Sequence, residues 1–134
     1  MKIVAALLCA FFALAPAKGK KPELKLKAPR MVFLPPSGPY QRTSVTIRVT
    51  GRLEGDPEDP EEYYCLEELW EWGDETESSY QPDCDPYEEG GELKRHFSAS
   101  RQYRYPGTYR ITLRLQRDNK TVLMGRTRVR IRGN

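Results

Sequence analysis

Five carboxylates lie close together in the middle of the chain, where paired acids could perform general acid–base chemistry. They are Glu67, Glu68, Glu71, Asp74 and Glu75. Residues 54–92, however, contain 17 of the 19 acidic residues, so close pairs of acids arise there by chance. His96 is the only histidine, and no serine or cysteine stands in the setting of a hydrolase nucleophile. We therefore expect no catalytic residue and no enzyme activity.

Acidic side chains in loops can instead bind calcium, which prefers carboxylate and carbonyl oxygens. The weak candidates for such a site are Asp56, Asp59, Asp83 and Asp85. No DxDxDG loop is present, and solvated acidic loops are the alternative interpretation. We expect no cofactor, and calcium is kept as the alternative.

Cys65 and Cys84 are the two cysteines that follow the leader described below. In an oxidising compartment we expect them to form a disulfide that closes a loop of about 20 residues. The alternative, a pair of metal-binding thiolates, has little support because the spacing is not CxxC and His96 alone could assist.

The first 17 residues have the pattern of an export signal. Lys2 precedes a continuous apolar run, Ile3 to Leu14, and Ala15-Pro16-Ala17 is a small-x-small cleavage site. We expect residues 18–30 to be a basic, partly flexible N-terminal segment and residues 31–134 to form one domain. No later segment approaches the roughly 18 apolar residues of a membrane span. The mature protein is therefore expected to be secreted, periplasmic or at the cell surface.

Alternating apolar and polar residues predict an all-β protein of about seven strands. The expected strands lie near residues 24–27, 31–34, 43–50, 66–72, 93–99, 109–116 and 121–132. Residues 66–72 also have a helical alternative, but the strand is favoured because Trp70-Glu71-Trp72 precedes Gly73-Asp74. Residues 75–91 are expected to be turns, and Gly125 is a candidate bulge. Many short strands separated by Gly and Pro turns predict a β-sandwich.

Two segments resemble the signatures of the polycystic-kidney-disease (PKD) domain family. Trp70-Glu71-Trp72-Gly73-Asp74-Glu75-Thr76 is similar to the family's aromatic-x-aromatic-Gly-Asp-Gly-Thr motif. Tyr103-Arg104-Tyr105-Pro106-Gly107-Thr108-Tyr109-Arg110-Ile111-Thr112-Leu113 resembles its Tyr-x-x-Pro-Gly-Thr-Tyr-x-Val-x-Leu motif. The resemblance covers roughly residues 66–132.

The resemblance implies an immunoglobulin-like β-sandwich, outside the cell, that binds proteins or polysaccharides without catalysis. It places Trp70 and Trp72 in the core and a tight turn at Gly73, with the Asp74 side chain bonded to nearby backbone amides. Pro106-Gly107 sets a second turn, after which Thr108 and Tyr109 begin a strand. Glu75 departs from the family pattern, which has glycine there, and Arg101 stands where the family often has histidine.

Arginines alternate with apolar residues along the last two expected strands. They are Arg110, Arg114, Arg126, Arg128, Arg130 and Arg132. Paired strands would gather them on one face, which can bind an anionic surface such as an acidic polysaccharide. The alternatives are a solubilising outer face, or docking onto acidic loops of this chain or of a second copy. Nucleic acid is not expected as a partner of an exported protein without interleaved aromatic residues.

We therefore expect a small exported binding or adhesion module with a protein or polysaccharide partner. The alternative is a structural or self-associating envelope protein that uses contacts between basic and acidic surfaces. Asn119-Lys120-Thr121 matches an N-glycosylation sequon at the tip of the last hairpin.

Overall fold

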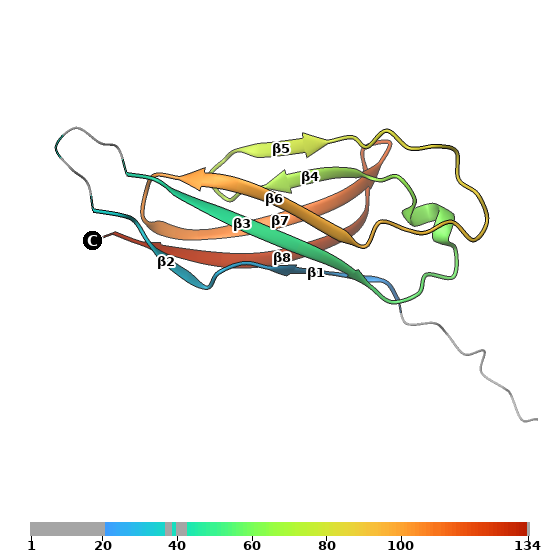
Figure 1. Ribbon diagram of the computed structural model, residues 1–134, viewed down its shortest axis with the longest axis horizontal. Coiled ribbons are helices and arrows are strands. Elements are labelled where there is room, and N and C mark those ends of the chain that lie inside the picture. Colours follow the sequence, from blue (N-terminus) through green and yellow to red (C-terminus); the bar gives the residue numbers. More distant parts are fainter. Residues whose placement is uncertain (1–20, 37–38, 40–42, 134) are drawn as a thin grey trace, which may run out of the picture.

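The computed structural model describes residues 21–36, 39 and 43–133, which form eight strands and one short 3-10 helix (Figure 1). The strands are β1 (Glu23–Lys27), β2 (Met31–Phe33), β3 (Val45–Glu54), β4 (Glu67–Glu71), β5 (Glu77–Tyr80), β6 (His96–Tyr103), β7 (Gly107–Arg117) and β8 (Lys120–Arg132). The 3-10 helix η1 spans Pro60–Tyr63. The expected signal peptide, residues 1–17, lies outside the described residues. No helix in the described ranges is long and apolar enough to cross a membrane.

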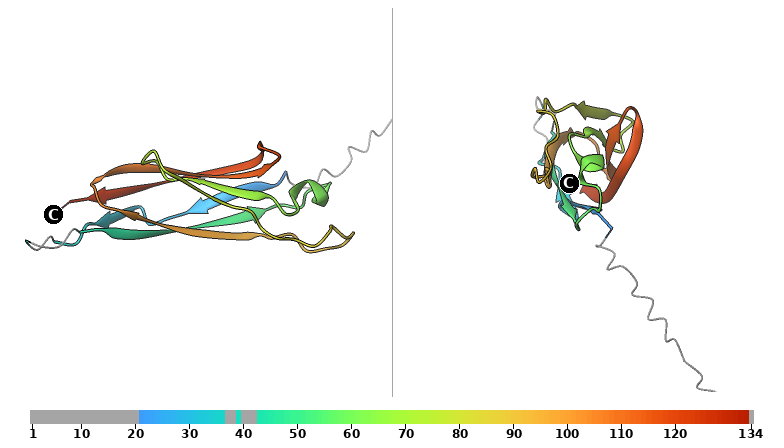
Figure 2. Two further views of the ribbon diagram at one scale, coloured as in Figure 1. Left: turned by 90° about the horizontal axis from the view of Figure 1, so that it is seen from above. Right: turned by 90° about the vertical axis from the view of Figure 1, so that its right-hand side faces the viewer.

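The strands form two sheets that pack face to face, which confirms the predicted all-β sandwich (Figure 2). One sheet has the strand order β1-β3-β6, and the other has the order β2-β8-β7-β4-β5. Neighbouring strands are antiparallel except for β2 and β8, which are parallel. The orders correspond to strands A-B-E and G-F-C of an immunoglobulin-like sandwich, with β5 added beside C.

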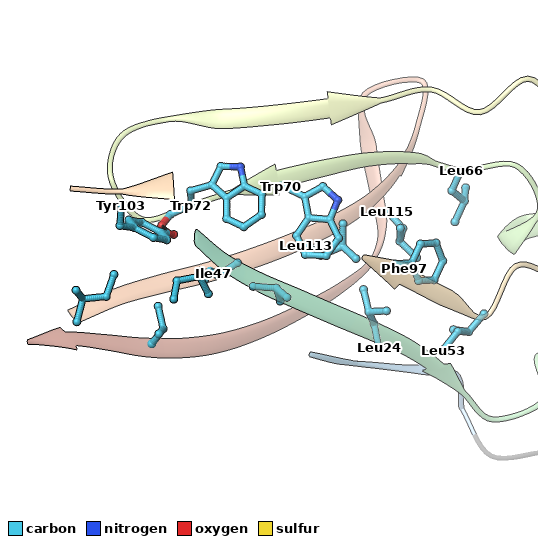
Figure 3. Close-up of a cluster of buried hydrophobic side chains, with 14 of the residues drawn as sticks. Leu24, Ile47, Leu53, Leu66, Trp70, Trp72, Phe97, Tyr103, Leu113 and Leu115 are labelled. Atoms are coloured by element: carbon cyan, nitrogen blue, oxygen red, sulfur yellow. Dashed lines mark hydrogen bonds between the residues drawn. The ribbon is translucent and has the colours of Figure 1, made fainter. Parts of the chain in front are cut away.

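The core lies between the sheets and takes alternate residues from the long strands (Figure 3). In β3, Ile47 and Val49 are buried and Val45 is partly buried, as the alternation predicts. Trp70 and Trp72 are buried with their ring centroids 5.5 Å apart, almost parallel. Residues 67–71 form a strand rather than a helix, because the extended chain directs Trp70 and Trp72, the residue after β4, to the same buried side.

The hairpin of β7 and β8 closes through a two-residue turn at Asp118 and Asn119, both at positive φ. Such turns match the right-handed twist of the flanking strands. The sequon at Asn119 is thus at the tip of the hairpin, as expected.

Gly125 is not a bulge, contrary to the sequence-based expectation. The irregularity in the β7–β8 register lies between Leu115 and Gln116. Gly125 is instead needed for close packing, because a Cβ atom there would lie 2.5 Å from the backbone oxygen of Leu24 in β1.

Several expected boundaries differ from the structure, and β3 extends four residues beyond its expected end, to Glu54. Residues 77–80 form β5, although 75–91 were expected to be turns, because the backbone of β4 pairs with them. The expected strand at 93–99 begins at His96 and continues to Tyr103. Part of the 18–30 segment belongs to the sandwich, because β1 pairs with β3.

Candidate functional site

Five arginines are exposed on the outer face of the five-stranded sheet, and we call this surface the arginine face. It consists of Arg110 from β7 and Arg126, Arg128, Arg130 and Arg132 from β8. The inward-facing residues Val129 and Ile131 alternate with the β8 arginines and are buried. The same alternation that fills the core therefore directs the arginines to solvent.

The register places Arg110 directly opposite Arg128. Within the described ranges, no ion pair involves any residue of the arginine face. Like charges directly opposite each other on paired strands destabilise a sheet by roughly 0.2–1 kcal/mol. The face thus has a cost in the isolated molecule that an anionic ligand would offset.

Arg114 was grouped with these residues from the sequence, but the structure separates it from them. Its Nε donates to Oε1 of Glu71 on β4 at 2.6 Å, and its side chain is only partly exposed. Neighbouring Thr112 on the same outer face is buried. Arg114 is thus neutralised, and the charge available to a ligand lies toward Arg110 and β8.

An apolar margin borders the arginine face, and the sequence did not predict it. Met31 and Phe33 of β2 pair in register with Arg130 and Arg132, and their exposed fractions are 48% and 57%. The run Met31 to Leu34 is entirely apolar, but in a strand alternate residues face opposite sides. Buried Leu34 and half-buried Val32 supply the inner side, which leaves Met31 and Phe33 beside the arginines.

The acidic loops lie at the opposite end of the molecule from Arg132. Figure 1 shows η1 and the chain between β5 and β6 at one end, and the C-terminal end of β8 at the other. Exposed acids in these loops include Asp59, Glu61, Glu62, Asp83 and Asp85. The molecule therefore has an acidic end and a basic end on its long axis.

The calcium candidates do not form a ligand cluster in the structure. Asp56 is bound to Arg95 through a 3.4 Å contact, and Asp59 precedes η1 without a side-chain capping bond. Asp83 and Asp85 flank Cys84 in an exposed loop. Among the described residues, no group of three or more His, Cys, Asp or Glu side chains is arranged to hold a metal.

The first family-like motif forms the turn between β4 and β5. Gly73 has φ +78°, and a Cβ atom there would lie 2.5 Å from the backbone oxygen of Arg110. Oδ1 of Asp74 accepts a hydrogen bond from the Thr76 amide at 3.1 Å and another from the Thr76 hydroxyl. Oδ2 of Asp74 accepts two bonds of 3.2 Å from Arg101. The expected role of Asp74 as a turn-fixing acceptor matches this geometry.

Burial pushes the pKa of Asp74 upward, but the hydrogen bonds from Thr76 and the charge of Arg101 outweigh it, so the pKa lies below its ordinary value. Arg101 stands where the family often has histidine, and its role as a partner of this carboxylate was not foreseen. The two residues are 27 positions apart, so only the packing of β6 near the turn brings them together.

The second family-like motif leads into β7 at the same end. The Tyr103 hydroxyl donates to the buried backbone oxygen of Trp72 at 2.7 Å. The ring centroids of Tyr103 and Tyr109 are 4.3 Å apart. Burial raises the pKa of Tyr103. Pro106 lies in the exposed turn before β7. Gly107 and Thr108 are the first two residues of β7. Tyr109 is half-buried against the core, and its hydroxyl donates to the Tyr105 oxygen.

The two cysteines form a disulfide, as expected from the sequence. It joins the segment after η1 to the loop after β5, across 19 positions of chain. A small cavity of about 150 Å³ lies beside it, lined mainly by apolar and aromatic side chains that include Tyr63, Tyr64 and Phe97.

A buried acid lies close to this end of the sandwich. Glu68 faces inward from β4, with 3% of its surface exposed, and its Oε2 accepts a 2.9 Å bond from Lys94. The Lys94 ammonium also lies over the rings of Tyr80 and Phe97, at 5.5 and 5.2 Å from their centroids. These contacts satisfy the carboxylate internally.

The carboxylates that first suggested acid–base chemistry do not converge. Glu68 points into the sandwich, whereas Glu71 lies on the outer face with Arg114. His96 is exposed at the start of β6.

Comparisons with known proteins identify no family for this chain. No family model matches it, and no curated protein matches it. Two solved structures of the CARDB domain from Pyrococcus furiosus are similar to it in shape. The solution NMR structure has a TM-score of 0.47 and 12% identity, and covers 83% of this chain and 94% of that domain. The crystal structure, in complex with di-metal ions, has a TM-score of 0.46 and 10% identity, and covers 85% and 94%.

Proposed function

We propose that this protein is a small exported, non-catalytic binding module of the PKD-like kind, which engages an anionic protein or polysaccharide. The observation that carries the proposal is the arginine face, in which Arg110 lies opposite Arg128 and neither forms an ion pair with an acid among the described residues. Like charges that lie directly opposite each other do not stabilise the isolated fold. A polyanion would relieve the repulsion and form charge-assisted hydrogen bonds with the guanidinium groups.

The chemistry of the arginines favours carboxylate or sulfate groups in a repeating chain. Side chains two residues apart on one strand are separated by about 7 Å, and neighbouring strands by about 4.8 Å. Several anionic groups of one polymer can therefore contact Arg126, Arg128 and Arg130 together. The exposed rings and chains of Phe33 and Met31 add apolar contact at the margin.

The direct test is binding to an immobilised polyuronate, with Arg128→Ala plus Arg130→Ala compared with the natural protein. We expect binding to weaken about 3- to 10-fold, because two exposed charge contacts are lost. Binding of both proteins should also weaken as salt rises. Undiminished binding of the double variant would refute the role of the arginine face.

The matched control is Arg48→Ala plus Arg52→Ala. These two exposed arginines lie on β3, on the outer face of the other sheet, so this variant removes the same charge. The control should bind as the natural protein does if the face matters rather than net charge. An equal loss in both variants would indicate attraction by net charge alone.

A second candidate function is a self-associating envelope component. The separation of acidic loops and arginines toward opposite ends favours it, because end-to-end contact would join unlike charges.

A further inference from the structure

β6 is a free edge of the three-stranded sheet. The order β1-β3-β6 ends with it, and the chain between β5 and β6 contributes no strand within the described residues. Constant-type immunoglobulin sandwiches have a further strand beyond this position, so that their sheet reads A-B-E-D. Figure 2, in its left view, shows β6 along one margin of the molecule.

The hydrogen bonds to β3 determine which backbone groups of β6 face outward. The Leu53 amide donates to the Arg95 oxygen at 2.8 Å, in line with the register that pairs Gly51 with Phe97. Hydrogen-bonded pairs alternate along an antiparallel ladder, so the odd-numbered residues of β6 bond to β3. The even-numbered residues therefore direct their amides and carbonyls away from the sheet. These are His96, Ser98, Ser100 and Gln102.

Charged side chains protect the other long edge of this sheet but not β6. In β1, Lys25 and Lys27 lie on the exposed side of the strand, and lysines on an edge strand commonly prevent unwanted pairing. The even-numbered residues of β6 are exposed and contain no Lys, Arg, Asp or Glu. Arg101 is on the inner side, held by Asp74. An eight-residue edge without such protection is suited to pair with another strand.

We propose that β6 pairs antiparallel with β6 of a second copy of this chain, which joins the two three-stranded sheets into one of six strands. The strand is complementary to itself. Pairing must match even-numbered with even-numbered residues, and the register that forms the most backbone hydrogen bonds places Ala99 on the two-fold axis. His96 then lies opposite Gln102 of the second copy, and Ser98 opposite Ser100.

This register gives about eight backbone hydrogen bonds, since four hydrogen-bonded pairs exchange two each. The serines can bond across the strands, and the small side chain of Ala99 lets the backbones approach at the axis. Within β6 itself no like charges are opposed. Arg48 on β3 lies three strand spacings, about 14 Å, from β3 of the second copy. This distance exceeds the screening length of about 8–10 Å at moderate salt.

Cross-linking tests the register. A cysteine at position 99 would meet its own copy in a pair without hydrogen bonds, at a Cα separation of about 4.5 Å, which a disulfide can span. Ala99→Cys should therefore form a covalent dimer under mild oxidation, seen by non-reducing electrophoresis. Ser100→Cys is the matched control, because its copy lies about 8–9 Å away and out of reach. Equal cross-linking of both variants would overturn the register.

Sedimentation equilibrium tests the interface. The natural protein should dimerise to a similar extent at about 0.1 M and 1 M salt, because backbone hydrogen bonds are not screened as charges are. Ser98→Lys plus Ser100→Lys should be monomeric, since it opposes two pairs of lysines across the axis.

Thr46→Lys plus Thr50→Lys is the control for added charge. It places the same charges on the exposed side of β3, one strand away from the edge, and should remain dimeric. Thermal unfolding followed by circular dichroism confirms that each variant folds. A monomeric natural protein, or a dimer that persists with lysines at 98 and 100, would overturn the proposal. Either result leaves the polyanion-binding assay unaffected, because the arginine face is on the other sheet.

Discussion

At the scale of single residues, the turn between β4 and β5 shows how few side chains fix this end of the molecule. Gly73 permits a backbone that no Cβ atom would fit, and Asp74 satisfies the Thr76 amide. Glu75 lies between Asp74 and Thr76, and its φ of +66° is in the left-handed region. The family motif has glycine at this position. The sequence identified the turn and the departure at position 75, and the structure shows the left-handed backbone that Glu75 adopts there.

Glu75→Gly should stabilise the protein. A non-glycine residue in the left-handed region costs roughly 1–2 kcal/mol, and the greater freedom of glycine in the unfolded chain returns about 0.5–1 kcal/mol of this. The expected gain is thus about 0.5–1 kcal/mol in the free energy of unfolding, measured by urea denaturation. Gly73→Ala is the contrasting control and should destabilise by more than about 2 kcal/mol, because its Cβ would overlap the Arg110 backbone. No gain from Glu75→Gly would contradict the strain argument.

Asp74→Asn should destabilise the protein at neutral pH, and the effect should fade in acid. Because the folded pKa of Asp74 is lowered, its charge contributes stability above the unfolded pKa of about 4, and this stability is lost as pH falls through the folded pKa. We expect a difference on the order of 1 kcal/mol at pH 7, since solvent screens the pair with Arg101.

Denaturant unfolding at a series of pH values between about 7 and 2 measures this difference. Asp59→Asn removes one acid whose side chain makes no capping bond to η1, and so controls for the change of charge. If the difference between the natural protein and Asp74→Asn were constant over the range, the ionised Asp74 would not be the cause.

At the scale of elements, the segment between β4 and β6 depends on its covalent link. β5 has four residues, all exposed, and the following loop has few buried side chains. The disulfide between Cys65 and Cys84 ties this loop to the start of β4. It therefore replaces some of the packing that a further strand would supply.

Cys65→Ser plus Cys84→Ser should cost about 3 kcal/mol in the free energy of unfolding, because the unfolded chain regains the entropy of a loop of this length. Chemical denaturation of the natural and variant proteins measures it. Ser78→Ala on β5 provides a comparison, since it removes a single bond from the Trp72 indole to a serine hydroxyl and should cost about 1 kcal/mol. A cysteine variant as stable as the natural protein would show that packing alone holds the loop.

At the scale of the whole molecule, the charges are separated although the net charge is only +3. The acidic loops lie at one end, while the arginine face extends toward the C-terminal end of β8 (Figure 1). A molecule with two such ends attracts polyanions at one end and cations at the other. Under the second proposed function, such a molecule would also attract its own copies.

If end-to-end contact of unlike charges occurs, the protein should form oligomers larger than a dimer at low salt, and these should dissociate as salt rises. Light scattering over a salt series measures their mass. Arg130→Glu plus Arg132→Glu should abolish the larger species, since it reverses the charge at one end. Oligomers insensitive to salt and to this reversal would exclude the electrostatic arrangement. The β6 dimer is distinguished from them because it should survive high salt.

The local features could be predicted from the amino-acid sequence alone. Alternation in residues 45–49 and 127–132 predicted which side chains face the core, because a strand directs successive residues to opposite sides. It predicted the strand around Trp70, the turn at Gly73, the disulfide, and the exposure of the arginines on β8. These depend on near neighbours in the chain, or on a pairing with only two candidates.

Contacts between residues that are distant in the chain could not be predicted in this way. The structure pairs Arg101 with Asp74 and Lys94 with Glu68. It also pairs Arg114 with Glu71, so Arg114 does not belong to the arginine face. Phe33 lies beside Arg132. The irregularity in the β7–β8 register lies between Leu115 and Gln116 rather than at Gly125, and β6 is at the edge of its sheet. Strand order and register depend on how two sheets pack over a common core, and the pattern of a single strand does not contain that information.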